Sequence, residues 1–212
     1  MPHCRLRRPG INIRCMRTLA DALDDFIDHY VKSVQPLLEP FDAEWRSPCE
    51  IGEQEHRDGK TVIAWRPVRR NNIHVLDRLE AAFEVSLHPD LKTWWGRWFS
   101  GHFEALAPDG PLTLLQLWNA ADGDRMVENQ IGHVMAQRRA RAPLSFFFAC
   151  TEDESDLQLT VDNQTGQVLL EPPGRKPLRA LAPDLATFID ELVPRSATPL
   201  SQPQEGVLGR GP

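Results

Sequence analysis

The sequence predicts a single α+β domain in which helices flank a largely antiparallel or mixed central sheet. Three observations lead to this class: amphipathic helical patterns near both ends of the chain, short apolar strand patterns between them, and turn signals that join neighbouring strands. The chain has 212 residues, of which 41% are apolar, and this is enough for one core of ordinary size.

The predicted domain covers residues 16–196 and leaves a short segment at each end. Residues 1–15 are basic but lack the apolar stretch of a secretory signal, so we expect either a disordered leader or a true translation start at Met16. Residues 197–212 are rich in proline and glycine, which is typical of a disordered tail.

The first helix is predicted over residues 18–34, where apolar residues recur at helical spacing and Thr18 can cap the first turn. The other face of this helix is acidic, which usually indicates solvent exposure. Residues 35–49 hold three prolines and are predicted to form a loop. A hairpin should follow over residues 49–67, with its Asp-Gly turn at residues 58–59.

Two helices and two strands are predicted in the middle of the chain. The helices cover residues 73–85 and 89–95, and the second of them has proline at an early position, as helices prefer. The strands cover residues 96–106 and 111–118. Because the second strand is nearly all apolar, we expect it to be central in the sheet.

A long helix is predicted over residues 122–141, ended by Pro143. Gly132 should allow another element to approach this helix closely. The buried side chains of the helix are predicted to be Val127, Ile131, Val134 and Met135. Three strands and a closing helix should follow, over 144–150, 157–161, 167–171 and 183–192. The second and third of these strands should form a hairpin that turns at residues 163–166.

The chain carries no recognisable catalytic motif. It has no GxxxxGK[ST] phosphate loop, no GxGxxG nucleotide fingerprint, no GxSxG nucleophile elbow and no CxxC pair. Its seven histidines form no compact pair of metal ligands. We therefore predict a protein that is not an enzyme and has no catalytic residues, no metal site and no cofactor.

Two residues keep a catalytic alternative open. Cys49 could form a nucleophile pair with His133, although a buried thiol is the more common role for such a cysteine. His133 could also act as a base near Glu128, or it could be a partly buried histidine with one ring nitrogen satisfied by a neighbour. We favour the structural interpretation for both residues, because no further catalytic group accompanies them.

A cluster of arginines, Arg138, Arg139 and Arg141, follows at the predicted helix C-terminus. These side chains could contact phosphate. Cations are, however, favoured at a helix C-terminus by the helix dipole, and the surrounding domain is acidic. We therefore expect a structural role within the molecule.

Charge is distributed unevenly along the chain. Residues 1–17 hold five arginines and no acid, and residues 197–212 hold one residue of each sign. Without these, the chain's 24 basic and 30 acidic residues become 18 and 29, a formal net charge of −11 over residues 18–196. Such a domain should repel nucleic acid and attract basic partners, most strongly at low salt, although excess acid can also serve solubility alone.

Two stretches of sequence carry a family resemblance. PLTLLQLW at 111–118 and ENQIGHVMAQRR at 128–139 are similar to the pattern of the SecY-interacting protein Syd family, which belongs to the SUKH superfamily. Gln130 stands where the family has leucine, and Val34 stands where it tends to have tryptophan. The resemblance extends over about residues 16–195.

The resemblance implies an α+β SUKH fold and a non-enzymatic protein, which we expect to be a monomer. Syd proteins associate with the cytoplasmic face of the inner membrane indirectly, through the translocon channel protein SecY. An acidic, concave surface is expected to receive the basic loops of SecY and to sequester or regulate SecY that is not properly assembled. The alternative is a toxin-inhibiting immunity protein, as in other SUKH members.

The carboxylates around the second helix and before the long helix are the candidates for this acidic surface. For each of them, solvated surface acid is the competing interpretation. The candidate partner-binding residues are Glu80, Glu84, Asp90, Glu104, Trp118, Asp122, Asp124 and Glu128.

Overall fold

A computed structural model describes residues 17–70, 72, 74–152 and 156–196. The predictions for the leader 1–15 and for the tail 197–212 lie outside these described residues. The helices within them are α1 (Leu19–Ser33), α2 (Asp77–Phe83), α3 (Pro89–Arg97), α4 (Ala120–Ala140) and α5 (Leu185–Asp190). The strands are β1 (Leu38–Pro40), β2 (Glu50–Arg57), β3 (Lys60–Trp65), β4 (Val68–Arg69), β5 (Trp98–Phe99), β6 (Phe103–Ala107), β7 (Gly110–Leu114), β8 (Ser145–Thr151), β9 (Gln158–Asp162), β10 (Val168–Glu171), β11 (Arg179–Ala182) and β12 (Val193–Pro194).

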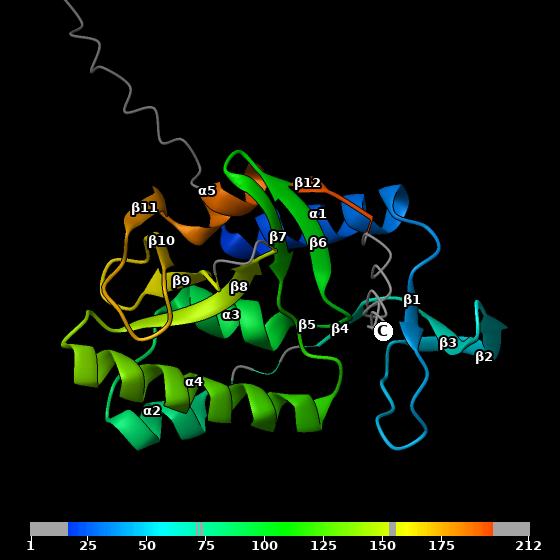
Figure 1. Ribbon diagram of the computed structural model, residues 1–212, viewed down its shortest axis with the longest axis horizontal. Helices are drawn as coiled ribbons and strands as arrows, with labels where there is room; N and C mark the ends of the chain where they lie inside the picture. Colours follow the sequence, from blue (N-terminus) through cyan, green and yellow to red (C-terminus); the bar gives the residue numbers. More distant parts are fainter. Residues whose placement is uncertain (1–16, 71, 73, 153–155, 197–212) are drawn as a thin grey trace, which may run out of the picture.

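The strands pair into antiparallel sheets. The main sheet has seven strands in the order β11-β10-β9-β8-β7-β6-β12, so β8 lies at its centre and β7 is internal, as predicted. A smaller sheet of order β1-β3-β2 lies beside the main sheet (Figure 1), and β4 pairs with β5. This arrangement confirms the predicted α+β fold.

Ring contacts of two neighbouring phenylalanines of β8 show which helices cover each face of the main sheet. The ring of Phe148 meets Trp94 of α3 and Phe188 of α5 edge to face, at centroid distances of 5.3 and 5.8 Å. The ring of Phe147 meets His133 of α4 at 5.5 Å. Because successive side chains of a strand point to opposite faces, α3 and α5 cover one face and α4 covers the other.

The helix α1 begins as the sequence predicts, since Thr18 Oγ1 accepts the backbone N–H of Asp21 at 3.2 Å. The expected solvation of its acidic face does not hold at Asp24. This carboxylate accepts two hydrogen bonds of 2.6 Å from Arg97 and one of 3.0 Å from Trp98 Nε1. The Arg97 bonds lower the pKa of Asp24 and connect α1 to the end of α3.

Two secondary-structure predictions in the first half of the chain are wrong. Residues 96–106 do not form one strand, because the helix α3 continues through Arg97 and residues 100–102 separate β5 from β6. Trp94 and Trp95 are both buried on α3, so packing extends the helix beyond the predicted end. Residues 35–49 are not entirely a loop, since they contain β1, which pairs with β3.

The buried face of α4 differs from the predicted apolar stripe. Met135 is 42% exposed, and a Cβ built at Gly132 would meet nothing within 4 Å, so neither the burial nor the close approach predicted there occurs. Polar side chains take part of the buried face instead, which a search for apolar periodicity does not detect. The buried residues are Gly123, Met126, Val127, Gln130, His133, Val134 and Gln137.

Turn chemistry is predicted well, whereas short edge strands are not. Asp58 and Gly59 have φ angles of 49° and 76°, as a two-residue hairpin turn requires, and Gly166 has a φ of 77° in the second predicted hairpin. The strands β11 and β12 were not predicted, because neither has a clear period of its own. Pairing with β10 and β6 determines their conformation.

Candidate functional site: an acidic cleft

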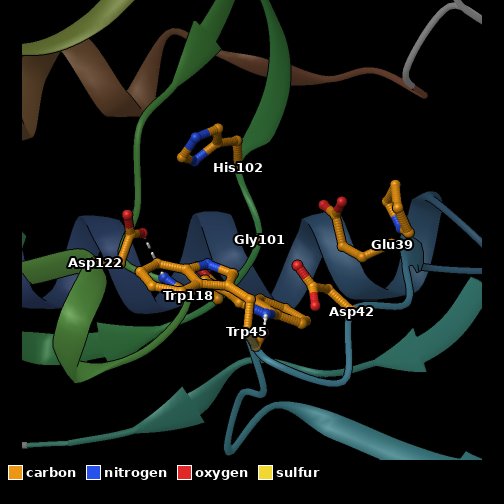
Figure 2. Close-up of a pocket in the computed structure, with 9 residues that line it drawn as sticks. Glu39, Asp42, Trp45, Gly101, His102, Trp118 and Asp122 are labelled. Carbon is orange, nitrogen blue, oxygen red and sulfur yellow. Dashed lines mark hydrogen bonds between the residues drawn. The ribbon is translucent and has the colours of Figure 1, made fainter. Parts of the chain in front are cut away.

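A cleft of about 230 Å³ is lined by three segments that are separated in the sequence (Figure 2). They are β1 with the loop after it, the linker between β5 and β6, and the start of α4 together with Trp118 just before it. We call this site the acidic cleft, because three of its lining residues are carboxylates and none that the structure describes is lysine or arginine. The lining residues are Glu39, Pro40, Asp42, Trp45, Ser100, Gly101, His102, Trp118 and Asp122.

Trp118 fixes the geometry of the cleft wall. Its indole Nε1 donates to the backbone oxygen of Trp45 at 3.2 Å, and its backbone N–H donates to Asp122 Oδ2 at 3.0 Å. The indole ring also meets the buried Trp65 ring edge to face, at a centroid distance of 6.0 Å. Asn119 caps α4 by accepting the N–H of Asp122 at 2.9 Å. The helix start therefore holds Asp122 and Trp118 in one orientation.

A second tryptophan, Trp45, lies next to Trp118 in the cleft, with Asp122 to one side of the pair and Glu39 and Asp42 to the other (Figure 2). The guanidinium of Arg125 stacks on the Trp45 ring, with its Cζ 3.8 Å from the ring centroid. This cation–π contact shows that the aromatic edge of the cleft accepts a guanidinium group.

Glu39 is a half-buried carboxylate that no hydrogen bond or ion pair connects to another residue in the described part of the chain. Burial raises its pKa, because the charged form is deprived of water. Gly101 makes room for this side chain. A Cβ at position 101 would lie 2.8 Å from Glu39 Oε1 and 2.8 Å from Trp65 Cζ2, so glycine is required there.

Two polar side chains complete the cleft. His102 Nδ1 accepts the backbone N–H of Gln116 at 3.1 Å, which places the ring proton of the neutral form on Nε2. His102 is exposed at the cleft, but the protein atoms close to its ring partly desolvate it, and this lowers the pKa of His102. The shift favours the neutral ring, which carries no positive charge. Ser100 is fully buried, and its Oγ has no hydrogen-bond partner among the described residues.

The predicted site residues are only partly brought together. Trp118 and Asp122 line the acidic cleft. The structure places the other predicted residues outside the cleft lining: Glu80, Glu84, Asp90, Glu104, Asp124 and Glu128.

Two of these outlying carboxylates have partners of their own. Glu80 accepts the backbone N–H of Leu87 at 2.8 Å and lies 2.7 Å from Lys92 Nζ, and the Lys92 bond lowers its pKa. Asp124 forms an ion pair of 2.6 Å with Arg78, and both side chains are exposed. Glu80 thus holds the connection between α2 and α3, while the Asp124 pair is of the kind that contributes little to stability.

Three more differ in their exposure. Glu84 ends α2 with a left-handed φ of 54°, and Glu128 is exposed on α4. Asp90 lies in the first turn of α3, where burial raises its pKa. Among these three, Glu84 and Glu128 are available to a partner as simple surface charges.

Glu104 belongs to a separate cluster at the edge of the main sheet. It accepts a hydrogen bond of 2.9 Å from Thr113 Oγ1, and it lies near Glu152 and Arg195. Burial and then the neighbouring Glu152 raise the pKa of Glu104 to about 7, whereas Glu152, hydrogen-bonded to Glu104 and Arg195, has a lowered pKa. One proton is therefore shared within this pair near neutral pH.

The residues that sequence reasoning missed lie in the segment 39–45, EPFDAEW, and in the linker 100–102. Both segments were assigned to ordinary loop or strand. The combination of acids with an aromatic residue in the first of them was an available signal. The linker offered no signal, because its place in the cleft depends on how β6 pairs.

His133 lies in a buried polar environment on α4. It is 8% exposed, and its Nε2 lies 3.2 Å from Oε1 of the buried Glu171, without the alignment of a hydrogen bond. Gln137 Nε2 and Ser145 Oγ donate to the same Glu171 oxygen, at 3.1 and 2.8 Å. Glu128, the carboxylate proposed as its neighbour, is exposed instead. His133 is therefore buried beside a polar neighbour, but the predicted satisfaction of one ring nitrogen by a neighbour is not confirmed, because Nε2 has no hydrogen-bond partner among the described residues.

Three other features of the described residues concern metal binding, membrane-spanning helices and the arginine cluster. No group of three or more histidine, cysteine or acidic side chains there could hold a metal ion. None of the described helices is both long enough and apolar enough to cross a membrane. Arg138 stacks on Phe83 with its Cζ 4.6 Å from the ring centroid, so this arginine has an intramolecular contact, as expected.

Comparison with known proteins gives one consistent family. A family model described as Syd protein (SUKH-2) matches residues 19–194. The chain is 40% identical to Protein Syd of Pseudoalteromonas atlantica over 181 residues, which is 84% of this chain and 96% of that protein. It is 37% identical to Protein Syd of Alteromonas mediterranea, covering 85% and 98%, and 31% identical to that of Idiomarina loihiensis, covering 86% and 98%. The chain therefore belongs to the Syd family.

Proposed function

We propose that this chain is a non-enzymatic binding protein that associates with the translocon channel protein SecY through the acidic cleft. The observation that carries the proposal is the meeting of Glu39, Asp42 and Asp122 with two tryptophans in one cleft of a Syd-family chain. Cytoplasmic loops of membrane proteins are enriched in lysine and arginine. Carboxylates steer such loops towards the domain, and aromatic side chains anchor them.

The proposed location is the cytoplasmic side of the inner membrane, with membrane association through SecY. The net charge of −11 over residues 18–196 supports an indirect association, because anionic lipid repels an acidic domain. The proposed role is to sequester or regulate SecY that is not assembled with its partners. Neither the matched family model nor the relatives give support to the toxin-immunity alternative.

Co-sedimentation with lipid vesicles tests the partner. We expect the chain to sediment with vesicles that contain SecY at about 50 mM salt, less at about 300 mM, and not with protein-free vesicles at either concentration. Equal sedimentation with both kinds of vesicle would rule out association through SecY. Tighter binding to SecY alone than to the assembled translocase would support the regulatory role, and the reverse order would contradict it.

A further inference from the structure

We propose that the acidic cleft receives a single arginine side chain of the basic partner, whose guanidinium pairs with Glu39 and Asp42 beside the indole rings of Trp45 and Trp118. This inference rests on the proposed function, because it specifies which chemical group of a basic loop enters the cleft. The surrounding surface carboxylates would then only steer the loop, whereas the cleft would select the side chain.

The first argument is the state of Glu39. Its carboxylate is half-buried, is largely removed from water, and has no hydrogen bond or ion pair with any other described residue. A desolvated carboxylate without a partner costs free energy, and a cation from another molecule would remove that cost. Asp42 lies beside it, with Oδ1 already accepting the backbone N–H of Glu44 at 2.8 Å, so its position is fixed by the turn.

The second argument is the pair of tryptophans, which favours guanidinium over ammonium. A guanidinium is planar and weakly hydrated and stacks on aromatic faces while it donates hydrogen bonds in its own plane. The protein already uses this contact beside the cleft, where Arg125 Cζ lies 3.8 Å from the Trp45 ring centroid. Arg70 makes a similar contact with Phe99 at 4.1 Å.

The third argument is an unsatisfied polar atom in the lining. Ser100 is fully buried, and its Oγ has no hydrogen-bond partner among the described residues, yet the residue lines the cleft. A hydroxyl oxygen can accept one of the five N–H donors of a guanidinium. The volume of about 230 Å³ is also large enough for a whole side chain, since one water needs only ~10–15 Å³.

The test uses calorimetric titration of the full chain with three synthetic peptides of the same length. One carries arginines, the second carries lysines at the same positions, and the third carries acetylated lysines without charge. We expect the arginine peptide to bind about five- to tenfold more tightly than the lysine peptide, and the neutral peptide not to bind. Equal affinity for the two charged peptides would overturn the arginine site.

Two variants, each lacking one carboxylate, test whether the preference for arginine arises in the acidic cleft. Glu39→Gln should weaken binding of the arginine peptide about tenfold and abolish the arginine preference. Glu53→Gln removes the same charge from an exposed position on β2, so it should change either affinity less than twofold and keep the preference. If both variants behave alike, the cleft does not select arginine. The peptide comparison with the unmodified chain holds even if a variant fails to fold.

The outcome for the arginine site can be separated from the outcome for the proposed function. If the charged peptides bind equally and the chain still sediments with SecY vesicles, the arginine site is wrong and the proposed function stands. If the arginine preference depends on Glu39 but SecY vesicles are not bound, the cleft is an arginine site for another partner and the proposed function fails.

Discussion

Glu39 and Glu171 illustrate two ways in which the same fold treats a buried carboxylate. Glu171 is 1% exposed, and Gln137 and Ser145 donate hydrogen bonds to its Oε1. Glu39 borders a cleft and has no such donor among the described residues. A carboxylate with internal donors contributes to stability, whereas one without them is available for binding. We therefore expect substitution of Glu171 to lower stability and substitution of Glu39 to weaken binding.

Removal of the Glu171 carboxylate should destabilise the protein strongly. Glu171→Ala leaves the donors on Gln137 and Ser145 buried without this acceptor, and we expect a loss of about 2–4 kcal/mol in the free energy of unfolding. Urea denaturation at neutral pH measures this loss. Glu128→Ala, at an exposed position on α4, should change it by less than ~0.5 kcal/mol. Similar values for the two variants would show that the Glu171 hydrogen bonds are not important.

Glu104 should make stability depend on pH between about 4.5 and 7. Its pKa is raised to about 7 in the folded protein from an ordinary value of 4.5, so its favourable contribution is complete below the ordinary value and is lost as pH rises through 7. Glu104→Gln removes this titration, while Thr113 can still donate to the new amide oxygen.

Urea denaturation of both proteins at several pH values checks this prediction. The unmodified protein should lose stability relative to Glu104→Gln as pH rises from about 4.5 to about 8. A difference between the two that stays constant over this range would mean that Glu104 titrates as it does in the unfolded chain.

Elements differ in how far the sequence alone predicts them. The start of α1 and the two hairpin turns follow from local chemistry, since Thr18, Gly59 and Gly166 act on residues next to them. The end of α3 and the polar inner face of α4 depend on packing against the rest of the molecule. Local patterns therefore predicted the first group of features and missed the second.

The same distinction between local chemistry and packing explains which cleft residues the sequence predicted. Trp118 and Asp122 were predicted because they lie in and next to the stretch that carries the family resemblance. Glu39 and the linker 100–102 were missed because β1 and β6 bring them together only after the sheets have formed. Of the cleft, sequence reasoning found the wall at the start of α4 and not the opposite side.

The two glycines 101 and 132 should respond to alanine in opposite ways. Gly101→Ala places a Cβ 2.8 Å from the buried Trp65 ring, and we expect a loss of about 1–3 kcal/mol together with weaker peptide binding. Gly132→Ala adds a methyl group to open space inside α4 and should gain about 0.5–1 kcal/mol. Thermal or urea unfolding measures both. Tolerance of alanine at position 101 would mean that the cleft walls are not closely packed.

At the scale of the whole molecule, the charge of the domain and the shape of the cleft have separate roles. The net charge of −11 over residues 18–196 acts at long range and should make association with a basic partner fast and salt-sensitive. The cleft acts only on contact, through Glu39, Asp42 and Asp122. Surface carboxylates elsewhere contribute to the long-range attraction but not to the contacts inside the cleft.

The most direct test of the central claim compares two triple variants that have the same net charge. One neutralises the cleft by Glu39→Gln, Asp42→Asn and Asp122→Asn, and the other neutralises the exposed residues Asp28, Glu53 and Asp58 in the same way. The measurement is the equilibrium affinity for SecY in vesicles at about 150 mM salt. We expect a loss of more than tenfold for the cleft variant and less than threefold for the surface variant. Equal losses would contradict the account, because net charge alone would then explain the binding.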